Sequence, residues 1–125
     1  MISSLKKPTV VMADDHPGNL ARVSQILGDE FEVLAQVADG ATALSCALAL
    51  QPDILILDFA MPRMNGIQTA RELRKRGYRS SILFLTIQAD ADYMEALDEI
   101  GARFVSKLRM QTELVPAIRA ELNKG

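Results

Sequence analysis

Short apolar runs alternate with longer segments of helical spacing along the chain. The apolar runs lie at residues 10–13, 33–37, 54–57, 82–85 and 104–105. The third and fourth are almost continuously apolar, which is typical of strands covered on both faces. The pattern therefore predicts five strands at these positions.

The segments between these runs carry apolar residues three, four or seven positions apart, as amphipathic helices do. Pro17 suits a first helical turn, and Gly77 and Gly101 are expected to end the third and fourth helices. We expect Thr112 to cap the fifth helix, which tolerates Pro116 only in its first turn. The five stripes are Leu20, Val23 and Leu27; Ala41, Leu44, Ala47 and Leu48; Ile67, Ala70 and Leu73; Tyr93, Ala96, Leu97 and Ile100; and Leu114, Ile118 and Leu122.

Strand and helix alternate five times, which favours an α/β fold with helices on both faces of a parallel sheet. The common doubly wound order for five strands is 2-1-3-4-5. We expect one such domain over residues 9–123, after an extension at 1–8 and before a short tail at 124–125. Functional groups in sheets of this kind gather beyond the carboxyl ends of the strands.

Composition limits the possible partners, cysteine chemistry and cellular location of the protein. The chain has 125 residues and a net charge of −2, which gives no general electrostatic reason to expect nucleic acid or a membrane as partner. Cys46 is its only cysteine, which excludes an intrachain disulfide and a thiolate metal cluster, and we expect it in the core. The apolar runs are far shorter than a membrane span, and the first eight residues do not resemble a signal peptide, so we expect a cytoplasmic protein.

A basic cluster lies near the third helix, and we expect it to form a solvated face. It has no interleaved aromatic residue for stacking on bases, so nucleic-acid binding is not expected there. Its members are Arg71, Arg74, Lys75, Arg76 and Arg79.

Polar side chains stand where the predicted strands end. Asp14 and Asp15 follow the first strand, Asp58 ends the third, Thr86 ends the fourth and Lys107 follows the fifth. Because neighbouring strands lie about 5 Å apart, Asp58 would sit between the acidic pair and Thr86. The long side chain of Lys107 would reach in from two strands away.

Three crowded carboxylates need a proton or a cation among them. Oxygen donors with room for water suit Mg²⁺. A carboxylate beside Mg²⁺, a hydroxyl and an ammonium group can accept a phosphoryl group, since that transfer depends mainly on positioning and charge neutralisation.

The runs at residues 11–17, 57–66 and 104–107, which read VMADDHP, LDFAMPRMNG and FVSK, resemble the receiver domains of response regulators. The resemblance extends from Thr9 to Leu122 and is closest to receivers that carry a helix-turn-helix output domain. It implies a flavodoxin-like fold in which Asp58 is the phosphoacceptor. It also implies Mg²⁺ bound by Asp14, Asp15, Asp58 and the backbone carbonyl of Ala60.

The same resemblance implies roles for residues around the acceptor. Thr86 and Lys107 would bind the phosphoryl group, and Thr86 and Phe104 would move as a switch. Ile87 would narrow access to Asp58, while Ala60 and Gln88 would tune the lifetime of the acyl phosphate. Leu108 stands where many relatives carry a proline reached through a cis peptide bond, so the geometry after Lys107 is left open.

We expect His16 to cap or pack locally at the start of the first helix rather than to take part in the chemistry. The enzyme alternative, an aspartyl phosphatase or phosphotransferase, usually has its nucleophile in an Asp-x-Asp run after the first strand, where this chain has adjacent carboxylates. A degenerate receiver that only binds partners fits poorly with the complete set of site residues.

The preferred hypothesis is a phosphoacceptor switch rather than an enzyme. Its donor would be a sensor histidine kinase or a histidine phosphotransfer protein. Its output would be a changed helix 4/strand 5 surface for partner binding or a homodimer. DNA would be bound only through an output domain outside these 125 residues.

Overall fold

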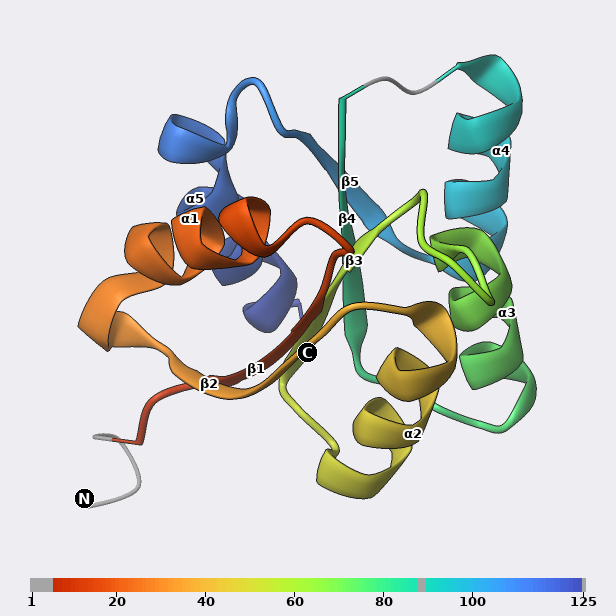
Figure 1. The fold of residues 1–125 in the computed structure, drawn as a ribbon, viewed down its shortest axis with the longest axis horizontal. Coiled ribbons are helices and arrows are strands. Elements are labelled where there is room, and N and C mark those ends of the chain that lie inside the picture. Colours follow the sequence, from red (N-terminus) through yellow and green to blue (C-terminus); the bar gives the residue numbers. More distant parts are fainter. Residues whose placement is uncertain (1–5, 88–89, 125) are drawn as a thin grey trace.

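The computed structural model describes residues 6–87 and 90–124. Within them, five parallel strands form one sheet in the order β2-β1-β3-β4-β5 (Figure 1). The strands are β1 (Thr9–Ala13), β2 (Glu32–Val37), β3 (Ile54–Asp58), β4 (Ser81–Thr86) and β5 (Arg103–Ser106). The predicted fold class and strand order are confirmed.

Helices cover both faces of the sheet. In Figure 1, α1 and α5 lie on one side, and α2, α3 and α4 lie on the other. The helices are α1 (Pro17–Leu27), the 3₁₀ turn η2 (Gly28–Glu30), α2 (Gly40–Leu50), α3 (Gly66–Lys75), α4 (Ala91–Ile100) and α5 (Met110–Leu122). Among the described residues, no helix combines the length and apolar character that crossing a membrane requires.

The central strand β3 is buried along its whole length. Because successive side chains of a strand point to opposite faces, Leu55 and Leu57 pack towards α2, α3 and α4. Ile54 and Ile56 pack towards α1 and α5. The strand therefore ends with Asp58 at the carboxyl edge, between β1 and β4.

The fifth helix differs from its prediction in two respects. It begins at Met110 with Arg109 as N-cap, so Thr112 is not the cap. Met110 is buried in the core, and its burial brings the helix start three residues earlier. Pro116 lies inside the helix and not in the first turn. It removes one helical hydrogen bond, and it is tolerated on the exposed side of α5, where its ring does not disturb the core.

One member of the basic cluster does not lie on a solvated face. The Arg74 guanidinium is half-buried and donates to three backbone carbonyls. Its Nε lies 2.9 Å from the carbonyl oxygen of Ile100, and one terminal nitrogen lies 2.8 Å and 2.9 Å from those of Tyr78 and Ser80. Arg74 thereby joins the end of α3 to the end of α4 and to the segment that leads into β4.

Candidate functional site

Asp58 ends β3 with only 6% of its surface exposed. The start of α3 packs directly against its backbone, and the Gly66 amide donates to the Phe59 carbonyl at 2.8 Å. A Cβ atom at Gly66 would lie 2.4 Å from the Asp58 carbonyl oxygen and 2.8 Å from the Phe84 ring. A glycine at this position therefore lets α3 approach and fix the end of β3.

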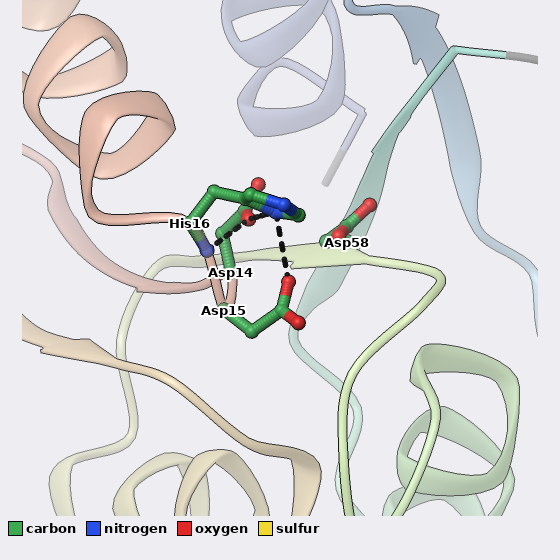
Figure 2. Close-up of side chains that lie close together, drawn as sticks. All are labelled: Asp14, Asp15, His16 and Asp58. Atoms are coloured by element: carbon green, nitrogen blue, oxygen red, sulfur yellow. Dashed lines mark hydrogen bonds and ion pairs between the residues drawn. The ribbon is translucent and has the colours of Figure 1, made fainter.

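Asp14 and Asp15 follow β1, on the side of β3 opposite β4. The Asp14 carboxylate is buried, and it accepts from the His16 amide at 2.9 Å and from the Asn19 side-chain amide at 3.3 Å. The Asp15 side chain is 35% exposed, so this corner of the site opens to solvent. Figure 2 shows the Asp14–His16 turn facing Asp58 across the strand ends.

Lys107 follows β5 and reaches across two strands into the site. Its Nζ lies 2.9 Å from Asp14 Oδ2 and 3.1 Å from Asp58 Oδ1, and its side chain is 12% exposed. Its backbone amide donates to the Thr86 carbonyl at 2.8 Å. The peptide bond to Leu108 is trans. The Lys107 ammonium therefore contacts both carboxylates, although the next residue is Leu108 and not a proline.

The charged groups of the site shift one another's pKa values. Burial, followed by the negative charge of Asp14, raises the pKa of Asp58 above its ordinary value, and the Lys107 ammonium only partly offsets this. Burial disfavours the charged form of Lys107, yet its contacts with Asp14 and Asp58 leave its pKa raised overall. The ammonium therefore stays protonated, while ionised Asp58 remains costly without further positive charge.

His16 contacts the acidic pair of the site, although only a local capping or packing role is expected for it. Its Nδ1 lies 3.0 Å from Asp15 Oδ1 and 3.5 Å from Asp14 Oδ1, and its side chain is 71% exposed (Figure 2). The residue stands at the N-cap position of α1, but its side chain makes no capping hydrogen bond. The expectation of a side-chain cap is therefore wrong, and the expectation that His16 takes no part in the chemistry stays a prediction. The only signal in the sequence was its position directly after the acidic pair.

One ligand atom each from Asp14, Asp15, His16 and Asp58 lies within 4.8 Å of the others. The carboxylate oxygens are hard donors from a half-open corner, which is the kind of set that Mg²⁺ prefers because it keeps part of its water shell. The Ala60 carbonyl belongs to the exposed loop that follows β3. The residues present can therefore hold a divalent cation of this type.

The other predicted site residues lie on the neighbouring strands. Thr86 ends β4 and is buried, and the next residue, Ile87, is 60% exposed. Phe104 is half-buried on β5, opposite Phe84 of β4. Gln88 lies outside the described residues.

An aromatic cluster on the α3 and α4 side of the sheet was not anticipated as part of the site. The Tyr93 ring stands at its centre, with its centroid 5.1 Å from that of Phe59, 5.9 Å from Phe84 and 6.5 Å from Phe104. The helical stripe identified Tyr93 only as a core residue. The cluster links α4 to the residue after Asp58 and to β5.

The family profile of the response regulator receiver domain matches residues 10–119 of the chain. Among curated proteins, the chain is 35% identical over 115 residues to EvgA, a DNA-binding transcriptional activator of Escherichia coli, covering 90% of this chain and 56% of that protein. It is 34% identical over 114 residues to the nitrate/nitrite response regulator NarP of Escherichia coli, covering 89% and 53%. The chain thus spans about half the length of these relatives.

Among solved structures, the chain is similar to a two-component response regulator of the LuxR family from Aurantimonas. The TM-score is 0.87 at 27% identity, and the match covers 94% of this chain and 86% of the other. The similarity therefore extends over nearly the whole chain.

Proposed function

Since the chain belongs to the receiver-domain family of two-component response regulators, we propose that it is a phosphoacceptor switch in which Asp58 accepts the phosphoryl group. The observation that carries the proposal is the position of Lys107, whose ammonium lies between Asp14 and Asp58. A buried cation at the acceptor is what a transferring phosphoryl group requires.

In the proposed reaction, a carboxylate oxygen of Asp58 attacks the phosphorus atom of a phosphohistidine. The new O–P bond forms as the P–N bond breaks, and the imidazole nitrogen leaves with the electron pair. Lys107 offsets the negative charge on the transferring oxygens, and the Thr86 hydroxyl donates to one of them. The reaction thus depends mainly on groups that the strand ends hold in place.

Asp14, Asp15, Asp58 and the Ala60 carbonyl would hold Mg²⁺ in this site. The ion, when bound, would supply positive charge for the acceptor and the phosphoryl oxygens. The half-exposed Asp15 leaves space for water among the ligands. The raised pKa of Asp58 fits a carboxylate that needs such a cation.

The proposed output is a change in the surface formed by α4 and β5. The phosphoryl oxygens would draw Thr86 towards Asp58, and Phe104 would turn into the space that Thr86 leaves. Both residues lie at or near the ends of adjacent strands, and Phe104 already contacts Tyr93 of α4. A local change of charge would therefore alter a surface that partners or a second copy of the chain could bind.

Three residues would tune access and lifetime. Ile87 is exposed beside the end of β4 and would restrict the phosphodonors that reach Asp58. Ala60 has no polar side chain to orient an attacking water, so we propose a long-lived acyl phosphate. Gln88 would also tune the rate at which the acyl phosphate on Asp58 is hydrolysed.

The proposed donor is a sensor histidine kinase or a histidine phosphotransfer protein in the cytoplasm. DNA would be bound through an output domain, as the match covers only 56% of the DNA-binding relative EvgA. We propose that the chain is not an enzyme with a separate substrate, since the group that is modified is its own Asp58.

The proposal is tested by incubating the protein with acetyl phosphate and Mg²⁺ and measuring its intact mass. The wild type should gain one phosphoryl group, which a chelator should prevent, and Asp58→Ala should gain none. Asp29→Ala, which removes an exposed carboxylate of η2, serves as the matched control and should behave as wild type. The central claim is wrong if wild type and Asp58→Ala gain phosphate equally, or if neither does.

A further inference from the structure

Tyr93 has a buried hydroxyl without a hydrogen-bond partner. The residue is only 9% exposed, and the oxygen has essentially no accessible surface. Among the described residues, only the hydroxyls of Tyr93 and Tyr78 are in this condition. A buried polar group left unpaired disfavours folding, whereas phenylalanine would fill the same space without that penalty.

The position of the ring connects Tyr93 with the proposed switch. Tyr93 lies in the first turn of α4, where its backbone amide is capped by Asp90 at 2.8 Å. Its ring meets Phe59, which follows the acceptor, and Phe104, the proposed switch residue, both edge-on. Burial raises the pKa of the Tyr93 hydroxyl, and the Asp58 carboxylate adds to this rise, so the phenol stays a donor within electrostatic range of the acceptor.

The two ends of α4 are held differently. At its C-terminal end, Arg74 binds the Ile100 carbonyl, and Arg71 pairs with Glu99 at 3.2 Å. At its N-terminal end, the Tyr93 side chain has only ring contacts. The end of α4 nearer to the acceptor is therefore the one that a new hydrogen bond would fix.

We propose that the Tyr93 hydroxyl couples phosphorylation of Asp58 to the position of α4. The hydroxyl is unpaired while Asp58 is unphosphorylated, and it donates a hydrogen bond to the phosphorylated site. The inference rests on the proposed function and adds to it a residue that positions α4. Phosphorylation brings three strong acceptor oxygens to the strand ends, where the Lys107 ammonium is already shared between two carboxylates. The Tyr93 ring packs on Phe59, the residue after Asp58, so its unpaired hydroxyl would be stabilised once these oxygens arrive.

The first test compares stability with and without a phosphoryl mimic. Tyr93→Phe should be at least as stable as wild type in the free state. In saturating Mg²⁺ and beryllium fluoride, its gain in melting temperature should be about 4 °C smaller than that of wild type. It should also bind beryllium fluoride about fivefold more weakly. Tyr78→Phe is the matched control, because it removes a buried hydroxyl that is remote from the site. Mg²⁺ and beryllium fluoride should raise its melting temperature as much as that of wild type.

The second test uses absorbance. The chain has two tyrosines and no tryptophan, so Tyr78→Phe leaves Tyr93 as the single reporter in the near ultraviolet. Loading with Mg²⁺ and beryllium fluoride should shift its band to longer wavelength, as phenols do when they begin to donate a hydrogen bond. A purely structural role of the ring would leave both the band and the gain in melting temperature unchanged.

The outcomes separate the two claims. If mass spectrometry shows phosphate on Asp58 but Tyr93→Phe gains as much stability as wild type, the inference about Tyr93 is overturned and the proposed function stands. If Asp58 takes up no phosphate in wild type, the proposed function fails, and the inference fails with it.

Discussion

Replacing Lys107 with methionine should destabilise the metal-free protein strongly at neutral pH. Methionine keeps most of the length and apolar contact of the side chain but removes the ammonium group. The Asp14 and Asp58 carboxylates, both with side chains 8% exposed, would then have no cation between them. The loss of unfolding free energy therefore measures how far Lys107 compensates the buried negative charge.

The magnitude follows from the two contacts of Nζ, at 2.9 Å and 3.1 Å. With an effective dielectric constant of about 20, each unit-charge attraction is roughly 5 kcal/mol, and the cost of desolvating the ammonium offsets much of the sum. Removing one partner of a buried ion pair costs about 3–5 kcal/mol. Because Asp15 opens the site to solvent, we expect about 3 kcal/mol, or about 11 °C in melting temperature for a chain of this length.

The assay is urea denaturation in the presence of a chelator, at pH 7 and at pH 5. Without Lys107 the pKa of Asp58 should rise further above its unfolded value, so the folded state binds the proton more readily than the unfolded state does. The free energy of unfolding of Lys107→Met should therefore increase relative to wild type as the pH falls. Lys75→Met is the control: the Lys75 side chain is 79% exposed and its ammonium lies 4.0 Å from a Glu72 carboxylate oxygen, so the loss of unfolding free energy should stay below about 0.5 kcal/mol. The reasoning is refuted if the two variants lose equal stability, or if the loss at Lys107 is the same at both pH values.

Three further outcomes are expected from the same denaturation assay. Asp58→Asn should be more stable than wild type at pH 7 without metal, because the raised pKa of Asp58 makes its ionised form unfavourable. The difference should shrink as the pH falls from 7 and be gone below about pH 4, where the acid is protonated in both the folded and the unfolded state. Gly66→Ala should lose about 3 kcal/mol through the clash with the Asp58 backbone, whereas Gly18→Ala, whose new Cβ would meet nothing within 4 Å, should lose none. Arg74→Met should lose about 2 kcal/mol and speed amide exchange at the end of α4, and unchanged exchange there would contradict the role assigned to the guanidinium.

The fold was predictable because its signals are local and repeated. Continuous apolar runs such as residues 54–57 identify buried parallel strands, and the five alternations leave few possible topologies. The site followed from the fold, since parallel strands that end in carboxylates bring them to one edge. The proximity of Asp14, Asp15 and Asp58 agrees with that expectation, and their roles remain predictions.

The features that the sequence did not reveal depend on contacts between distant residues. Arg74 looks like its solvated neighbours until the carbonyls of Tyr78 and Ile100 are placed around it. Thr112 is a good capping residue in isolation and predicts a later start of α5, whereas the burial of Met110 decides the boundary. The unpaired hydroxyl of Tyr93 is likewise a property of its surroundings, which no spacing along the chain records.

Polar contacts fix the last turn of α4 while only apolar ring contacts hold the Tyr93 side chain in its first turn, so the helix can act as a lever. Ten residues at 1.5 Å per residue give an arm of about 15 Å from the Arg74 contact to the first turn. A tilt of about 10° about that fulcrum would displace the first turn by roughly 2.6 Å and leave the last turn almost in place. A partner that contacts the first turn of α4 would sense this displacement, whereas one that contacts its last turn would not.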